Sequence, residues 1–147
     1  MIRPLASADL AALAPLFAAY LDFYRVDQLL DRQRAFLAGR LAAGDSAAFG
    51  AFEESGRLTG FALCHLAHNS LRLAPAWILH DLFVAPGNRR HGTARQLLDA
   101  VHAAARAAGA CEVTLSTAQT NTAARLLYER AGYRPDEVFR PYVFDLH

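Results

Sequence analysis

The sequence has few cysteines, almost no net charge and no long apolar run, and each shortage excludes a class of protein. Lys and Arg (15) nearly balance Asp and Glu (14), which leaves a formal charge of +1. No general basic surface is therefore available to recruit nucleic acid or an anionic membrane. No segment reaches the roughly 18 apolar residues of a membrane span, and Met1-Ile2-Arg3-Pro4 lacks the apolar core of a signal peptide. We expect a cytoplasmic protein that binds neither nucleic acid nor membrane.

Several kinds of site are missing as well. The two cysteines, Cys64 and Cys111, lie in separate apolar runs, which predicts reduced, buried thiols rather than a disulfide framework. His65 and His68 have no third or fourth ligand at a useful spacing, so no metal site is expected. Neither a Walker A motif nor a Gly-x-Gly-x-x-Gly before a helix is present, which argues against nucleotide hydrolysis and dinucleotide binding.

What is present is a chain of 147 residues, 54% of them hydrophobic, with the size and apolar content of one globular domain over residues 1–147. Apolar periodicity, capping residues and turn residues separate helices from strands. Strands are predicted over residues 2–5, 47–52, 58–66, 76–84 and 111–115, with two short final ones over 133–134 and 142–146. Helices are predicted over residues 10–21, 29–41, 93–107 and 121–131. This order indicates a mixed α/β sheet flanked by helices.

The chain is organised around the stretch from His80 to Ala94, where an apolar strand breaks at Pro86 into a turn rich in Gly and Arg. A helix follows immediately after Gly92. The first N–H groups of a helix lack carbonyl partners and carry the positive end of the macrodipole, and glycine allows a phosphate to approach the backbone. This junction is a candidate anion site, to which Arg89 and Arg90 add charge.

Two motifs resemble the signatures of the GCN5-related N-acetyltransferase (GNAT) superfamily. The first, Arg89-x-x-Gly92-x-Ala94, is similar to its pyrophosphate loop, with Ala94 in place of the commoner glycine. The second runs from Asn121 to Tyr133, with Leu127-Tyr128 seven residues after the Asn and then Gly132-Tyr133. Both occur in the expected order, and the succession of elements in the N-terminal half agrees with them.

The resemblance implies a GNAT fold, an acetyl-CoA cofactor and a mostly antiparallel sheet that splays where acetyl-CoA binds. Pantetheine would insert between the strand ending at Val84 and the Cys111 strand, near Asn121 and Ala124, and Tyr128 would point at the thioester sulfur. Backbone groups of one strand would pair with its amides: Leu82, Phe83 and Val84. One loop would hold the pyrophosphate: Arg89, Arg90, His91, Gly92, Thr93, Ala94 and Arg95.

Acetyl transfer to an amine requires the neutral amine, so a general base must be near it. His80 and Asp81 are the candidates, with a water and backbone carbonyls as the third possibility. Strand alternation turns the two side chains to opposite faces, so only one can face the cleft unless a bulge occurs there. Histidine is preferred because an ordinary imidazole titrates near pH 6.5, whereas a carboxyl with an ordinary pKa near 3.9 needs burial to raise it. Asp81 could instead bind the ammonium or serve a structural role.

The resemblance therefore predicts an acetyl-CoA-dependent N-acetyltransferase acting on a primary amine of a small molecule, such as a polyamine, an amino acid or an aminoglycoside-like compound. A peptide or protein amine is the alternative acceptor, and a non-catalytic acyl-CoA-binding module is the alternative function. Tyr24, with Tyr20 and Phe23, could line the substrate cleft, although aromatics at helical spacing are commonly core. The apolar segment from Tyr142 to Leu146 predicts a homodimer, because an exposed edge strand favours pairing.

Overall fold

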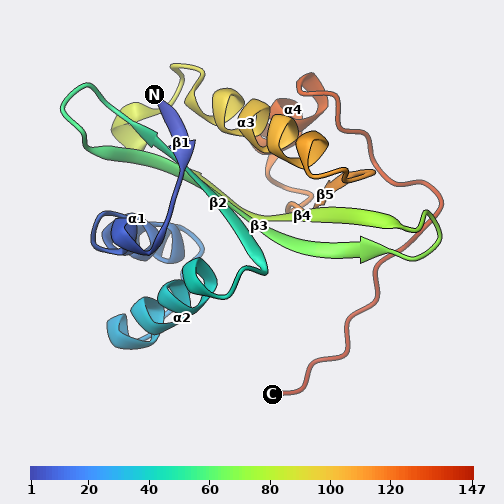
Figure 1. Cartoon of the computed structure of the whole chain (residues 1–147), viewed down its shortest axis with the longest axis horizontal. Helices are drawn as coiled ribbons and strands as arrows, with labels where there is room; N and C mark the ends of the chain where they lie inside the picture. The colour runs from blue at the N-terminus through green and yellow to red at the C-terminus, as the bar shows by residue number, and fades with distance from the viewer. The chain divides into compact units, whose positions relative to one another are not determined.

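The computed structural model describes all 147 residues, which form two compact units, Met1–Ser116 and Thr117–His147. The first unit contains a five-stranded sheet in the order β1-β2-β3-β4-β5 (Figure 1). Its strands are β1 (Ile2–Pro4), β2 (Ser46–Phe52), β3 (Leu58–Asn69), β4 (Ala74–Val84) and β5 (Val113–Leu115). Neighbouring strands are antiparallel except β4 and β5, which are parallel. The predicted mixed, mostly antiparallel sheet is confirmed.

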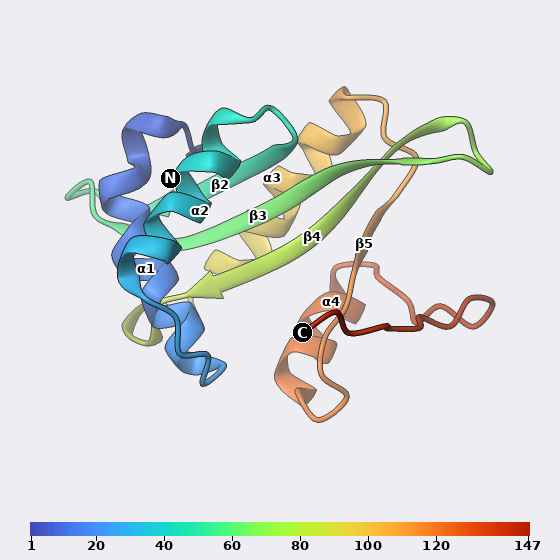
Figure 2. The same cartoon turned by 90° about the horizontal axis from the view of Figure 1, so that it is seen from below.

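Helices cover both faces of this sheet. α1 (Leu10–Phe23) and α2 (Leu30–Ala42) lie on one face and α3 (Thr93–Ala107) on the other, as the two views in Figures 1 and 2 show. Leu13 and Phe17 of α1 and Leu37 of α2 pack with Phe61 and Phe83 of the sheet to form the core under the first face. A rigid packed layer of this kind fixes the side chains that project from α1 and β4 toward one another.

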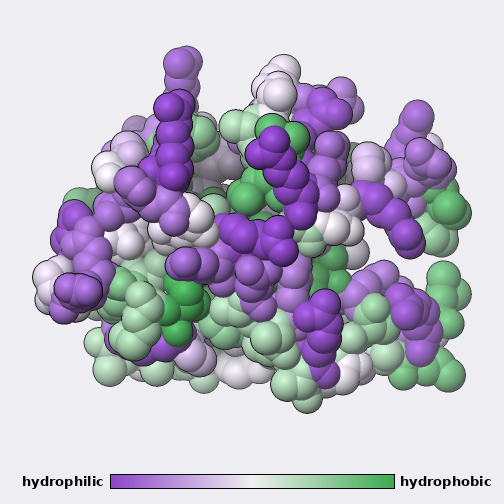
Figure 3. Space-filling model, turned by 90° about the horizontal axis from the view of Figure 1, so that it is seen from above, coloured by the Kyte–Doolittle hydropathy of each residue, from purple (hydrophilic) through white to green (hydrophobic).

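α3 follows from an amphipathic sequence. Leu97, Leu98, Val101 and Ala105 recur at helical spacing and are buried against the sheet. Polar residues take the opposite side of the helix, and the face of the molecule seen from above is largely hydrophilic across its middle (Figure 3). No helix in the chain is both long and apolar enough to cross a membrane.

The second unit contains α4 (Thr122–Arg130) and no strand. The predictions of strands over residues 133–134 and 142–146 are therefore wrong. Tyr133 instead completes the end of the helix, where its N–H donates to the Tyr128 carbonyl at 3.0 Å. Asp136 then accepts hydrogen bonds from the N–H groups of Val138 and Phe139 at 2.9 Å each, which stabilises a turn instead of an extended strand.

The region around Cys111 also differs in detail from the prediction. β5 begins at Val113, and its residues are only partly buried or exposed. Cys64 is buried as expected, whereas Cys111 is only partly buried, and both thiols are free.

Candidate active site

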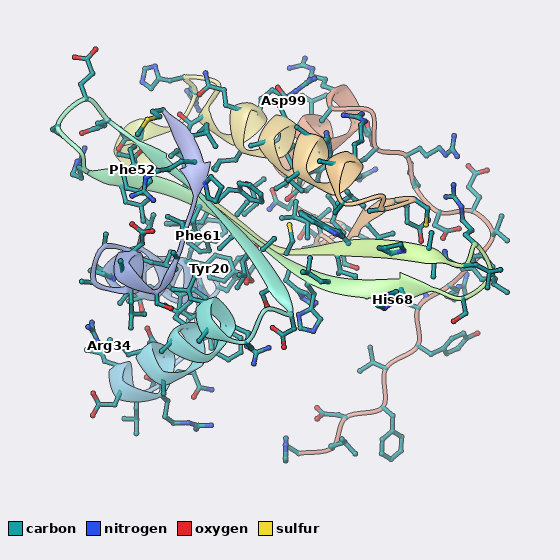
Figure 4. The ribbon with its side chains drawn as sticks, in the orientation of Figure 1. Tyr20, Arg34, Phe52, Phe61, His68 and Asp99 are labelled. Atoms are coloured by element: carbon teal, nitrogen blue, oxygen red, sulfur yellow. The ribbon has the colours of Figure 1, made fainter.

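A pocket of about 440 Å³ lies in the first unit, between the sheet and the helices α1 and α2. Figure 4 shows Tyr20 pointing from α1 toward the sheet beside Phe61. The pocket wall combines aromatic and aliphatic side chains with a small set of polar ones, as ligand sites commonly do. Its lining residues are Phe17, Tyr20, Leu21, Phe36, Arg40, Ser46, Leu63, Cys64, His65, His80 and Asp81.

A β-bulge places both predicted base candidates in this pocket. Leu63 of β3 pairs with Asp81 of β4, but the next residue, Cys64, pairs with Leu79, so His80 is an extra residue in β4. A bulge interrupts the alternation of a strand and re-aims its side chains. Because of this bulge, the adjacent residues His80 and Asp81 can line the same cavity, and both are among the pocket-lining residues.

Asp81 is held in a mostly apolar environment by one strong hydrogen bond. The Tyr20 hydroxyl donates to Oδ1 of Asp81 at 2.6 Å, joining residues 61 positions apart. Burial raises the pKa of the Asp81 carboxyl, and the hydrogen bond from Tyr20 and the nearby His80 oppose that rise without cancelling it. Burial thus moves the Asp81 pKa toward the range in which a carboxyl can accept a proton from a substrate.

Tyr20 owes its position to a cluster of aromatic rings. The rings of Phe17, Phe61 and Phe83 lie 5.7 to 5.9 Å from it. Tyr24 also packs against it, at 5.1 Å, but is about half exposed and is not among the pocket-lining residues. The structure therefore brings Tyr20 to the pocket and leaves Tyr24 as its outer neighbour.

Arg40 and His65 form the polar part of the pocket wall away from Asp81. Nη1 of Arg40 donates to Oδ2 of Asp45 at 2.7 Å, and the His65 ring lies 5.5 Å from the His80 ring in an edge-to-face arrangement. Cys64 contributes a neutral thiol, because burial and the adjacent Asp81 raise its pKa to about 12.

Beyond the bulge, β4 is no longer paired with β5. β5 pairs only with Trp77, Ile78 and Leu79, so the end of β4 has β3 on one side and no strand on the other. The Ala85 N–H donates to the Thr59 carbonyl at 2.8 Å.

Alternation in an antiparallel pair then directs the backbone groups of Phe83 toward β3 and those of Leu82 and Val84 away from it. Of the three residues predicted to pair with pantetheine, Leu82 and Val84 thus have backbone groups on the unpaired side. The Val84 carbonyl accepts a hydrogen bond from Nε of Arg89 at 2.8 Å.

The loop that follows β4 has the properties of an anion site. Gly92 is the N-cap of α3, with a φ of +78° that glycine adopts readily, and a Cβ there would have nothing within 4 Å. No acidic residue occupies the first turn of α3. His91 is exposed, Thr93 and Ala94 are partly buried, and Arg95 pairs with Asp99 at 2.9 Å. The backbone beside Gly92 is therefore accessible to a phosphate group at the positive end of the helix dipole.

The two loop arginines differ in role. The Arg89 guanidinium lies over the rings of Phe23 and Phe83, 5.3 Å from each centroid, and is fixed to the scaffold. Arg90 is exposed and has a φ of +66°. Just before them, Asn88 Nδ2 donates to Oε1 of Glu53 at 2.8 Å, which ties the loop to the turn between β2 and β3.

The second unit carries the remaining predicted residues. The Asn121 side chain caps α4 by accepting a hydrogen bond from the Ala124 N–H at 3.1 Å. The Tyr128 ring lies 5.8 Å from the Tyr133 ring, edge to face. Within its own unit, Asn121 therefore has the capping role that its place before the helix suggests.

Sequence reasoning missed the polar residues that come from distant parts of the chain. The Tyr20–Asp81 bond and the Asn88–Glu53 bond join residues 61 and 35 positions apart. Arg40 belongs to a helix with no motif. The one available signal was the aromatic run at the end of α1, which pointed to Tyr24 as well as Tyr20.

Comparison with known proteins bears on the family and the fold of this chain. Residues 13–133 match the acetyltransferase (GNAT) family. The chain is 39% identical over 145 residues to the uncharacterized N-acetyltransferase YhfO of Bacillus subtilis (strain 168), covering 99% of this chain and 97% of that protein. It is 33% identical to a probable acetyltransferase of known crystal structure, with a TM-score of 0.95 over 100% of this chain and 98% of the other.

A second solved structure shows the fold alone, because its identity is only 18%. It is an aminoglycoside acetyltransferase, meta-AAC0020, from an uncultured soil metagenomic sample, in complex with sisomicin. Its TM-score is 0.86, over 100% of this chain and 96% of the other.

Proposed function

The chain belongs to the acetyltransferase (GNAT) family and is an acyltransferase, and we propose that it transfers the acetyl group of acetyl-CoA to a primary amine of a small molecule. The observation that carries the proposal is the pocket in which His80, at a β-bulge, and Asp81, held by Tyr20, lie together beside the unpaired end of β4.

The residues present fit acetyl-CoA. Backbone groups of Leu82 and Val84 on the unpaired side of β4 would hold the pantetheine amides, and the backbone of the loop from Arg89 to Arg95 would hold the pyrophosphate. Support comes from the left-handed Gly92, the absence of acidic residues in the first turn of α3 and the fixed charge of Arg89. When bound, acetyl-CoA supplies the activated acetyl thioester.

The pocket residues supply what the acceptor needs. An alkyl ammonium with a pKa near 10.4 is neutral in only about one molecule in 2,500 at pH 7, so the amine must lose a proton to something nearby. We assign that proton to His80, which is exposed at the pocket wall. Asp81 attracts the ammonium form and orients it, and Tyr20 positions Asp81 through its hydrogen bond.

Tyr128 is the proposed proton donor to the departing thiolate. This role is supported by the match of Asn121, Leu127-Tyr128 and Gly132-Tyr133 to the second family motif. A phenol can donate to a thiolate, and the bond strengthens as charge develops on sulfur.

A small acceptor is favoured by the size and lining of the pocket. A volume of about 440 Å³ with aromatic walls suits a compact ligand, and the rings and the Asp81 carboxylate suit a cation. A cytoplasmic location and a homodimer complete the proposal.

The test is thiol release from acetyl-CoA across a panel of primary amines and amino-terminal peptides. Amine-dependent release with small amines, and an acetylated product by mass spectrometry, is expected. Turnover with peptides alone would move the acceptor to the alternative class. Calorimetric binding of acetyl-CoA without turnover on any amine would support the acyl-CoA-binding module.

A further inference from the structure

The polar groups of the pocket are divided by charge. Asp81 is the only carboxylate among its lining residues, and it lies beside His80. Away from it, the wall is formed by Arg40 and His65 with the hydroxyl of Ser46. A guanidinium in the pocket wall disfavours a second cationic group on the ligand at that end, because two like charges repel in a partly buried site.

Arg40 retains hydrogen-bonding capacity toward the pocket. Only its Nη1 donates to Asp45, at 2.7 Å, and a guanidinium has five N–H donors. Asp45 is not among the pocket-lining residues, is about half exposed and accepts a second hydrogen bond, from the Ser46 hydroxyl, at 2.9 Å. The ion pair therefore holds the Arg40 head beside Ser46 without closing it to a ligand on the pocket side.

The register of the sheet gives the distance between the Asp81 end of the pocket and the end formed by Arg40 and Ser46. Ser46 pairs with His65, Ala48 pairs with Leu63, and Leu63 pairs with Asp81. Ser46 and Asp81 are thus separated by two strand spacings across the sheet and two residues along it, about 12 Å between Cα atoms. Side chains stand nearly perpendicular to a sheet, so a hydrogen bond of about 3 Å at each end leaves about 6 Å for the ligand.

We propose that the acceptor is a small primary amine that carries a carboxylate about 6 Å from its nitrogen, and that Arg40 binds this carboxylate while Asp81 and His80 receive the amine. The inference rests on the proposed N-acetyltransferase function and narrows its substrate to ω-amino acids and compounds of similar length. Arg40 can pair with a carboxylate through two N–H donors, which fixes the orientation of the substrate as well as its charge. A diamine of the same length would place a second ammonium against Arg40, and an alkylamine would leave the N–H donors of Arg40 on the pocket side without an acceptor from the ligand.

Three matched series of acceptors test this proposal: ω-amino acids from 3-aminopropanoate to 6-aminohexanoate, the diamines of equal length and the corresponding n-alkylamines. Product formation is followed by thiol release and mass spectrometry. We expect kcat/KM for 5-aminopentanoate to exceed that for 1,5-diaminopentane and for pentylamine at least tenfold. We also expect the preference for the amino acid over the diamine and the alkylamine of equal length to be smallest for 3-aminopropanoate.

Substitution of Arg40 separates this role from a structural one. Arg40→Gln should reduce the ratio of kcat/KM for 5-aminopentanoate to that for pentylamine at least tenfold, mainly through KM, and Arg40→Lys should restore part of it. Arg34→Gln is the matched control. Arg34 is an exposed residue of the same helix, is not part of the pocket wall and should leave the ratio unchanged (Figure 4).

The outcomes distinguish the two proposals. Diamines or alkylamines acetylated as efficiently as the amino acids, or a ratio that Arg40→Gln does not change, would overturn the assignment of Arg40 and leave the acetyltransferase function in place. No acetylation in any of the three series, with acetyl-CoA still bound, would overturn both.

Discussion

His80 is the residue on which the proposed chemistry depends most directly. His80→Ala should lower kcat/KM about 100-fold near pH 7, within the range observed for loss of a general base. The loss should shrink toward pH 10, because the amine then deprotonates without assistance. Steady-state rates from pH 6 to 10 measure this. A constant ratio between variant and wild type across the series would transfer the role away from His80.

The ionised Asp81 carboxylate lowers the stability of the folded protein, although the proposed function requires it. Burial raises its carboxyl pKa above the ordinary value near 3.9. The folded state therefore binds this proton more tightly than the unfolded state. Below about pH 3.9 the Asp81 carboxyl is protonated in both the folded and the unfolded state, so its ionisation does not affect the free energy of unfolding. As the pH rises through the raised pKa of the folded state, the free energy of unfolding falls.

Asp81→Asn should consequently raise Tm at pH 7 while reducing kcat/KM. The amide oxygen of asparagine can still accept the Tyr20 hydrogen bond, so that contact is kept. The gain in Tm should vanish near pH 3.5, and thermal melts at the two pH values, read by circular dichroism, check both points. The charged or titratable side chains facing Asp81 are Tyr20, His80 and Cys64. A lower Tm for the variant at pH 7 would show that the carboxylate is stabilising.

Tyr128→Phe keeps the ring and its packing against Tyr133 while it removes the hydroxyl. We expect kcat to fall roughly 10 to 1,000-fold with little change in acetyl-CoA affinity, because the hydroxyl would act on charge that develops only during transfer. Single-turnover rates and calorimetry separate the two quantities. Unaltered kcat, with chemistry shown to be rate-limiting, would reduce Tyr128 to a packing residue.

At the scale of elements, the sequence predicted what local periodicity determines. Leu97, Leu98 and Val101 indicate α3, and the apolar runs over residues 47–52 and 58–66 indicate β2 and β3, because each pattern lies within one short segment of the chain. The bulge at His80 depends on the register of β3 against β4, which no local pattern encodes. The same holds for the Tyr20–Asp81 bond, a tertiary contact between α1 and β4.

The N-terminus of α3 provides the test of the predicted cofactor loop. Gly92→Glu should abolish acetyl-CoA binding, because its carboxylate would stand at the helix N-terminus where the pyrophosphate is expected. Gly92→Ala is the control, since it carries the same strain at a φ of +78° but adds no charge. Calorimetry should show binding by the alanine variant within a few-fold of wild type. Wild-type binding by Gly92→Glu would refute the loop assignment.

The C-terminal segment carries an apolar pattern from which a strand was wrongly predicted. The aromatic and apolar run from Tyr142 to Leu146 resembles a strand, yet strands need a neighbour to satisfy their backbone groups. In the structure these residues form no strand, and the side chains of Tyr142, Val143, Phe144 and Leu146 are 80–92% exposed. The prediction of a homodimer therefore rests on an exposed apolar segment and no longer on an edge strand.

Apolar side chains gathered in one exposed segment favour association, because contact removes their surface from water. We expect the protein to have twice its chain mass of 16.0 kDa in solution, as measured by light scattering during size exclusion. Phe144→Asp places a charge in the segment and should shift the mass to that of one chain. Glu137→Gln, an exposed change in the same tail outside the apolar run, should leave the dimer intact. A single-chain mass for the wild-type protein at working concentrations would contradict the dimer, and an unchanged dimer in Phe144→Asp would place the interface elsewhere.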